Sequence, residues 1–491
     1  MTLAAFVQPV VDWHALAPEV VLTGVILVVL ILDMIDSDRF RVMMPTVAGA
    51  GLLAALIPVL TLGLDGTDRT LFDGVYVVDD FSLVLKAVFL ISGYVVVLMS
   101  VDYIRDGDYH ENEYYTLLLS SLLGMVIIAS SRDLLTMFIA LELLSIPAYM
   151  LAGWRKGGLR GNEAGIKYYL MGVFASAVML YGMSLVFGQA GSTLFVDIAP
   201  ALGDAADTTP LITVGILFVV IGFAFKVSAV PFHTWAPDTY EGAPTPITAF
   251  LAVASKAAGF VALLQLVFVA FVERDDVIEP LFWILAALTM TIGNLIALRQ
   301  TNIVRMLAYS GVAQGGFMLA PLAVAGEAGD DAQQAIINYL IIYAFMNLGA
   351  FAVVITVARK TGSGEISSYG GLFQYAPGLT AAMTIFLFAL AGIPPLGGWF
   401  AKFGVFQAVI AADTLQGSLM GVVVAVNSVI ALVYYANVAK EMWFNPVPDG
   451  DERPVPITGS LGVAMAVTAA ATVLFGIVPQ AVARFGELAL L

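Results

Sequence analysis

The segment FAFKVSAVPFHTWAPDTYEG, residues 223–242, places a lysine and a proline at the end of a strongly apolar run. Residues 210–225 hold no charged side chain. Pro231 has no N–H, so the carbonyl of Val227 loses its helical hydrogen-bond partner. A helix broken at membrane depth persists only where protein or water satisfies the freed backbone groups. The segment therefore predicts a membrane helix interrupted at a polar or wet cavity, with Lys226 beside it.

The composition indicates a membrane protein along its whole length. Of 491 residues, 60% are hydrophobic and 12% are charged, whereas a soluble domain carries about 25% charged residues. Apolar runs of about 20 residues recur, each long enough to cross a bilayer as a helix. We expect an all-α polytopic protein with about fourteen transmembrane helices. Their expected cores are 16–35, 43–64, 81–101, 115–130, 133–152, 165–188, 210–230, 246–272, 281–298, 303–324, 335–358, 378–412 (broken), 416–440 and 459–479.

Several function classes are excluded by residue types. The chain has no cysteine, which rules out disulfides and Cys-ligated iron–sulfur clusters within it. Its three histidines are scattered, and no phosphate-binding or dinucleotide motif is present. The net charge of −16 argues against nucleic-acid binding, and acidic loops such as DGTDRTLFDG (65–74) are expected to form an acidic outer face. We expect neither a metal nor a cofactor in this chain.

Lysine and arginine predict the orientation. With the N-terminus outside, the outer connections hold only Arg69, Arg132, Arg274 and Arg484, and most other basic residues fall in inner connections. Both termini are then expected on the outer face of the cell membrane. The first residues contain Asp12 and Glu19 and no basic start, unlike a cleaved signal peptide.

Four lysines, Lys86, Lys226, Lys256 and Lys402, lie inside apolar spans. A charge at mid-membrane costs several kcal/mol and usually marks an ion pathway. Lys256 is far from both ends of its span, among small residues, and is expected to have a functional role. For Lys226 the alternative is a lysine that snorkels to an interface, and for Lys86 snorkelling is an equally good explanation.

Glu142 lies near the middle of its span and is expected to pair with a buried cation or, alternatively, to be a neutral acid bonded to a neighbouring helix. A glutamate–lysine pair about 6 Å apart gains about 3 kcal/mol at an effective dielectric of about 20. Moving the carboxylate away would release that energy and favour loss of the lysine's proton. The residue types therefore suit proton transfer driven by electrostatics.

A second interruption repeats the first. Pro394 and Pro395 precede Lys402 as Pro231 follows Lys226. Paired broken helices in two halves indicate internal repeats around a mid-membrane ion path. We expect three spans in 1–114, five-helix repeats in 115–272 and 281–440 with opposite topology because five is odd, and a last span at 459–479.

Long motifs resemble a known family. FKVSAVPFHTWAPDTYEGAPTPITAFLAVASKAAGF (225–260) is similar to the signature of the antiporter-like subunits of respiratory complex I and of multisubunit cation/proton antiporters. The wording YEGAPTPITAF resembles the subunit N branch of that family, the one found in NADH–quinone oxidoreductase. LAPEVVLTGVILVVLILD (16–33), DDFSLVLKAVFLI (79–91), FIALELLSIPAYML (138–151) and GIPPLGGWFAKF (392–403) match the same branch.

The resemblance implies a proton-translocating subunit of an enzyme complex that reduces quinone. It implies that Glu142 is the carboxylate partner of Lys226, Lys256 the central relay and Lys402 the exit-side lysine, with Pro231, His233, Pro394 and Pro395 in supporting roles. It also implies M-like and K-like membrane neighbours, surrounding lipid, and a hydrophilic arm that carries FMN and iron–sulfur clusters. Two alternatives are an Mrp-type Na⁺/H⁺ antiporter subunit and a scaffold whose buried charges only fix helix packing.

Overall fold

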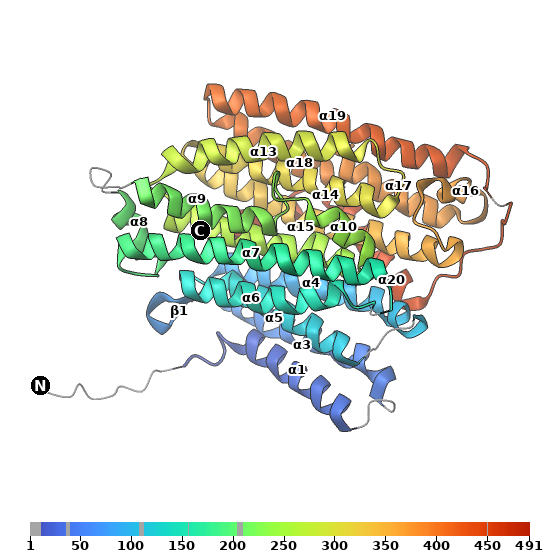
Figure 1. Cartoon of the computed structure of the whole chain (residues 1–491), viewed down its shortest axis with the longest axis horizontal. Helices are drawn as coiled ribbons and strands as arrows, with labels where there is room; N and C mark the ends of the chain where they lie inside the picture. Colours follow the sequence, from blue (N-terminus) through green and yellow to red (C-terminus); the bar gives the residue numbers. More distant parts are fainter. Residues whose placement is uncertain (1–10, 36–39, 108–111, 156, 204–209, 449) are drawn as a thin grey trace, which may run out of the picture.

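The structure is a computed structural model of the chain, and it describes residues 11–35, 40–107, 112–155, 157–203, 210–448 and 450–491. Helices dominate it. In Figure 1 they lie side by side with their axes along the long direction of the molecule, from α1 at one edge to α19 at the other. Neighbours in sequence therefore tend to be neighbours in the bundle.

The N-terminal part consists of three long helices and a hairpin. Its elements are α1 (Ala17–Ile35), the 3-10 turn η1 (Arg41–Met43), α3 (Met44–Asp65), β1 (Arg69–Leu71), the 3-10 turn η2 (Phe72–Gly74), β2 (Tyr76–Val78) and α4 (Asp80–Asp106). The two strands pair antiparallel, with Arg69 opposite Val78. Asp79 caps α4 by accepting from the Ser82 N–H at 2.8 Å, which fixes where this helix starts.

The middle part surrounds one fully buried helix. Its elements are α5 (Asn112–Ser130), α6 (Leu134–Ala152), α7 (Leu159–Ala190), α8 (Phe195–Gly203), α9 (Pro210–Lys226), α10 (Trp235–Gly242), α11 (Thr245–Phe250), the π-helical turn η4 (Leu251–Ser255), α12 (Lys256–Gln265) and the π-helical turn η5 (Leu266–Ala270). The last four form one continuous helix, of which residues 246–267 are all buried. This helix is the core of the bundle.

The C-terminal part contains the second interruption. Its elements are α13 (Asp275–Ala297), α14 (Ile303–Leu319), the 3-10 turn η6 (Ala320–Val324), α15 (Ala325–Thr361), the 3-10 turn η7 (Ile366–Tyr369), α16 (Leu372–Tyr375), α17 (Pro377–Ala391), α18 (Gly397–Ala411), α19 (Leu415–Phe444), α20 (Gly459–Ile477) and α21 (Gln480–Leu488). The predicted break before Lys402 is confirmed: α17 ends at Ala391 and α18 begins at Gly397.

The helices fit a membrane. Among the described residues, eleven helical stretches are long and apolar enough to cross a bilayer, and α9 and α17 are shorter apolar helices. The predicted break after Lys226 is also confirmed, because α9 ends at that residue and α10 begins at Trp235. The chain is a multi-pass membrane protein.

Loops gather at two opposite ends of the bundle. We call one the hairpin end: it carries β1, β2 and α8, and there the Arg132 carbonyl accepts from the Phe195 N–H at 3.0 Å. We call the other the basic end: it carries α16, and there Lys360 donates to the Asp451 carbonyl at 2.8 Å. Figure 1 shows the two ends at the left and the right of the view.

Candidate functional site

Lys226 is the last residue of α9 and is 4% exposed. Its ammonium donates to Ser145 Oγ on α6 at 2.9 Å and lies 3.5 Å from Tyr168 Oη on α7. Snorkelling to an interface is therefore wrong for this lysine, since the charged group is enclosed by three helices.

Glu142 lies on α6, three residues before Ser145, and is half-buried. Its Oε1 accepts from Ser176 Oγ on α7 at 2.6 Å. Within the described residues, no ion pair joins Glu142 to Lys226, and Ser145 is the closer partner of the ammonium. The structure thus places Glu142 one helix turn from Ser145, and it is the Ser145 hydroxyl that contacts the Lys226 ammonium.

Glu142 also lies on an outward-facing stripe of α6. Ile139 and Ile146, one turn before and one turn after it, are 58% and 52% exposed. Leu135 and Met150 extend the same stripe. Glu142 therefore borders an exposed apolar surface of the bundle.

The break around Pro231 exposes backbone groups that side chains satisfy. The Val230 N–H donates to Thr289 Oγ1 at 2.9 Å, and the Phe225 carbonyl accepts from the Trp235 indole at 3.1 Å. His233 is buried with its ring 6.3 Å from that of Tyr309, and His233 Nδ1 has no partner among the described residues. Buried polar atoms without partners are the places where internal water binds.

Lys256 lies at the centre of the bundle. It is 1% exposed and follows directly on the π-helical turn η4. Its ammonium donates to the Gly311 carbonyl on α14 at 2.5 Å. A Cβ at Gly259, one turn further along α12, would lie 2.8 Å from Val227 Cγ1 and 3.2 Å from Lys226 Cγ, so the missing side chain lets α12 pack closely on these two residues. Such π-helical turns often occur at functional sites.

Lys402 lies on α18 beyond the second break and is 6% exposed. It donates to the Ala391 carbonyl, freed where α17 ends, at 3.0 Å. Its ammonium also lies 4.5 Å from the centre of the Phe317 ring, a cation–π contact. Pro394 and Pro395 are exposed, so they form the break without lining the site.

Sequence reasoning missed the residues between Lys256 and Lys402. Gln314 on α14 donates to the Leu390 carbonyl at 2.9 Å and to Tyr435 Oη at 3.2 Å. Tyr435 also bonds to Ser310, and Tyr339 donates to Gln314 Oε1. The available signal was Gln314 itself, a polar residue in an apolar run, because polar residues at membrane depth are rare and usually have a function.

An ion cluster closes the basic end near the first break. Asp238 on α10 accepts from Lys167 at 2.7 Å and from Arg305 at 2.9 Å, and Arg305 also pairs with Glu241 at 2.8 Å. Asp238, Glu241 and Arg305 border a cavity of about 210 Å³. Partial burial alone would raise the pKa of Asp238, but the hydrogen bonds and charges of Lys167 and Arg305 hold that pKa below its ordinary value.

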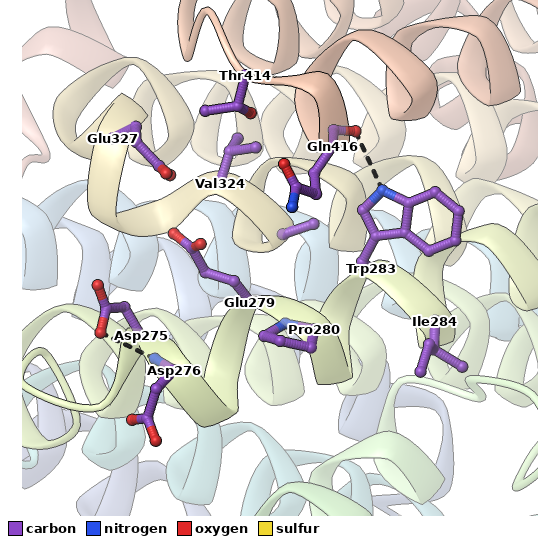
Figure 2. Close-up of a pocket in the computed structure, with 11 residues that line it drawn as sticks. Asp275, Asp276, Glu279, Pro280, Trp283, Ile284, Val324, Glu327, Thr414 and Gln416 are labelled. Atoms are coloured by element: carbon purple, nitrogen blue, oxygen red, sulfur yellow. Dashed lines mark hydrogen bonds between the residues drawn. The ribbon is translucent and has the colours of Figure 1, made fainter.

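Acidic residues gather in a pocket on α13 next to Arg274 of the hairpin end. The pocket has a volume of about 500 Å³. Figure 2 shows the carboxyl groups of Glu279 and Glu327 turned toward one another, with Asp275 to one side. On the opposite side the Trp283 indole donates to the Gln416 carbonyl at 3.1 Å. The described residues contain no group of three or more acidic or histidine side chains able to hold a metal ion.

The family model described as NADH:quinone oxidoreductase/Mrp antiporter, transmembrane, matches residues 131–428. NADH-quinone oxidoreductase subunit N of Trichlorobacter lovleyi is 37% identical over 97% of this chain and 96% of its own length. A chain of respiratory complex I from Thermus thermophilus is 29% identical, with a TM-score of 0.78 over 95% of this chain and 98% of that one. A chain of the Mrp complex from Dietzia sp. shares the fold, with a TM-score of 0.85 over 98% of this chain and 97% of that one at 20% identity.

Proposed function

Because the chain belongs to the subunit N family of NADH–quinone oxidoreductase, we propose that it moves protons along Glu142, Lys226, Lys256 and Lys402. The chain is a proton-translocating membrane subunit of an enzyme complex that oxidises NADH and reduces quinone. The single observation that carries the proposed route is the line of buried polar groups between the two broken helices.

The first half of the route lies between α6 and α12. Glu142 sets the electrostatic field at Lys226, and the Ser145 hydroxyl holds the ammonium at 2.9 Å. When the carboxylate is neutralised or moves away, the ammonium loses about 3 kcal/mol of attraction, for a separation of about 6 Å and an effective dielectric of about 20. The proton then passes through water in the break at Pro231 and His233 toward Lys256, which lies one turn before Gly259, the residue of α12 that packs on Lys226.

The second half runs from Lys256 to Lys402. The Gly311 carbonyl accepts from Lys256, and the adjacent Ser310 hydroxyl bonds to Tyr435. Gln314 joins Tyr435 to the Leu390 carbonyl, next to the Ala391 carbonyl that accepts from Lys402. Amide and carbonyl groups do not carry a proton themselves, so they orient water and hydroxyl groups that do.

We propose the predicted topology for the membrane. The helical stretch 303–361 has 59 residues, which at 1.5 Å per residue is far longer than a bilayer is thick. Non-helical dihedral angles at Gly329 (φ 24°) mark a kink close to where it must turn back. Counting it as two crossings, and each broken helix as one, gives the fourteen crossings expected from the sequence, with inverted repeats at 115–272 and 281–440, three crossings in 1–114 and a last one at 459–479.

We also propose the membrane orientation and the partner subunits that the sequence predicts. The hairpin end faces the outside of the cell membrane and the basic end faces the cytoplasm. Both termini are then outside, although residues 1–10 themselves are not among the described residues. The exposed apolar stripe around Glu142 is covered by a related M-like or K-like membrane subunit, and lipid covers other apolar faces. FMN and iron–sulfur clusters then belong to a hydrophilic arm, and quinone is reduced elsewhere in the complex.

The test is purification of the tagged chain in mild detergent, with mass spectrometry and an absorbance spectrum. A large assembly with flavin and iron–sulfur absorbance supports the proposed role. A colourless assembly of small membrane subunits would instead support the Mrp-type antiporter, and vesicle ion-exchange assays would follow. Lys226→Ala in the assembled complex tests the route itself: normal pumping in that variant contradicts it.

A further inference from the structure

A second buried cluster of ionisable groups lies in the N-terminal part, away from the proposed route. Lys86 on α4 is fully buried, so of the two explanations left open by the sequence, snorkelling is wrong. Its ammonium lies 2.9 Å from Glu19 Oε1 on α1 and donates to Tyr76 Oη on β2 at 3.1 Å. Tyr76 Oη in turn donates to Glu19 Oε1 at 2.5 Å. Three elements thus meet at one carboxyl–hydroxyl–ammonium triad.

The triad is incompletely hydrogen-bonded. Glu19 Oε2 is buried and has no partner in the described part of the chain. Lys86 has three N–H donors, and the described residues supply two oxygen acceptors. An unfilled buried hydrogen-bonding position is unfavourable, so a water molecule between Oε2 and Nζ would stabilise the site. The Glu19 side chain is 11% exposed, so the triad lies close to the surface of the bundle.

The neighbouring ion pair between Arg132 and Asp79 is, by contrast, well supplied with hydrogen-bond partners. Arg132 donates to Asp79 at 2.6 Å, to Gln265 at 2.9 Å and to the Ala129 and Ser131 carbonyls at 3.2 Å. Asp79 is further bonded to the Ser82 N–H. Since this guanidinium has acceptors on both terminal nitrogens and no need of water, it serves as a static anchor of the loop. The fully bonded Arg132 has a packing role, whereas the incompletely bonded Glu19 and Lys86 are suited to bind and release a proton.

We propose that Glu19, Tyr76 and Lys86 form a second proton-binding site, which exchanges one proton with water at the hairpin end during turnover. In the transfer, an Nζ–H bond of Lys86 breaks and an O–H bond of Glu19 forms, either directly or with the Tyr76 hydroxyl passing its own proton on. The pair becomes a neutral amine and a neutral acid. The acid then releases its proton to water at the exposed edge of Glu19, and the amine regains one from water.

A backbone link ties this site to the proposed route. Tyr76 forms a β-bridge with Ser131, and the Arg132 N–H donates to the Val75 carbonyl at 2.9 Å. That loop leads directly into α6, which carries Glu142 and Ser145. A shift of α6 during proton transfer therefore moves Tyr76 against Glu19. Only this step, the coupling to turnover, rests on the proposed function.

The test is infrared difference spectroscopy of the assembled complex, before and after reduction by NADH. We expect a carboxylic-acid signal that Glu19→Gln removes, that Tyr76→Phe shifts and that the control Asp79→Asn leaves unchanged. Absence of a Glu19 signal in the wild type would falsify the proposal and leave the triad as a structural ion pair. If Glu19→Gln does not assemble, Tyr76→Phe, which keeps both charges, decides: an unshifted spectrum overturns the site.

Failure of the route is recognised separately. Glu142→Gln should stop pumping and, through α6, weaken the Glu19 signal. If Glu142→Gln pumps normally, the route is wrong, while the Glu19→Gln spectrum still decides the second site by itself.

Discussion

Lys226 Nζ lies 2.9 Å from Ser145 Oγ, and this hydroxyl, one turn along α6 from Glu142, is nearer to the ammonium than Tyr168 Oη at 3.5 Å. The carboxylate therefore acts on Lys226 through space, while Ser145 holds it in place. A relay built this way lets the electrostatic attraction change without breaking the contact that positions the lysine. Ser145 becomes a residue that the proposed function requires.

Ser145→Ala should slow NADH-driven proton pumping in membrane vesicles while assembly persists. The ammonium loses a hydrogen bond of the charged kind, worth about 2 kcal/mol, and its position relative to Glu142 becomes loose. Ser184→Ala is the control, because Ser184 on α7 is exposed and bonds only to the carbonyl of its own turn, Tyr181. Equal pumping in the two variants would show that Ser145 has no part in the route.

Lys256→Met should abolish pumping with little loss of stability. An apolar side chain of similar length replaces a buried charge, and such exchanges are often neutral or stabilising. Lys360→Met, at the basic end, removes a lysine that bonds to the Asp451 and Arg453 carbonyls and lies over the Tyr375 ring, away from the route, and it should pump normally. Normal pumping in Lys256→Met would support the scaffold interpretation instead.

Gln314→Met should separate the two halves of the route. The Leu390 carbonyl and the Tyr339 hydroxyl both lose their partner, at a cost of about 1–3 kcal/mol each. We expect a lower melting temperature of the complex and strongly reduced pumping. Gln300→Met, which removes a partly buried bond to the Ile296 carbonyl within its own turn, is the matched change. A melting temperature equal to that of this control would contradict the assigned contacts.

Gly398→Ala should prevent stable assembly, whereas Gly404→Ala on the same helix should not. A Cβ at Gly398 would lie 1.7 Å from the Ala389 carbonyl oxygen, so α18 would be pushed away from the end of α17. Gly404 has nothing within 4 Å, and alanine there gains about 1 kcal/mol of helix propensity. The yield of intact complex after detergent extraction measures the difference, and equal yields would refute the close packing at this break.

Asp238→Asn should lower stability at neutral pH and lose that effect in acid. The pKa of the Asp238 carboxyl is lowered in the folded protein, so its contribution is present above the unfolded value and lost as the pH falls through the folded value. The melting-temperature difference from the wild type should be constant between about pH 8 and pH 5 and shrink below that. A melting-temperature difference that grows on acidification would contradict a lowered pKa of Asp238 in the folded protein.

The buried lysines and the two proline breaks could be predicted because each violates a local rule. A charge or a missing N–H inside an apolar span stands out without any tertiary information, as Lys226 with Pro231 and Lys402 with Pro394 did. The partners could not be predicted, because Ser145, Gly311 and the Ala391 carbonyl are ordinary in their own segments. For Lys86 the sequence left snorkelling open, and only the position of Glu19 and Tyr76 on other elements settled that the lysine is buried.

By itself, the sequence determined that this is a multi-pass helical membrane protein of one family, with ionisable groups inside its apolar spans. Hydropathy, charge and the chemistry of proline are properties of single segments, so they can be read along the chain. The tertiary structure alone decided that Ser145 meets Lys226, that Gln314 and Tyr435 connect α14 to the second break, and that Glu19, Tyr76 and Lys86 converge. Such contacts depend on which helix turns face one another, and that is set by packing across segments distant in sequence.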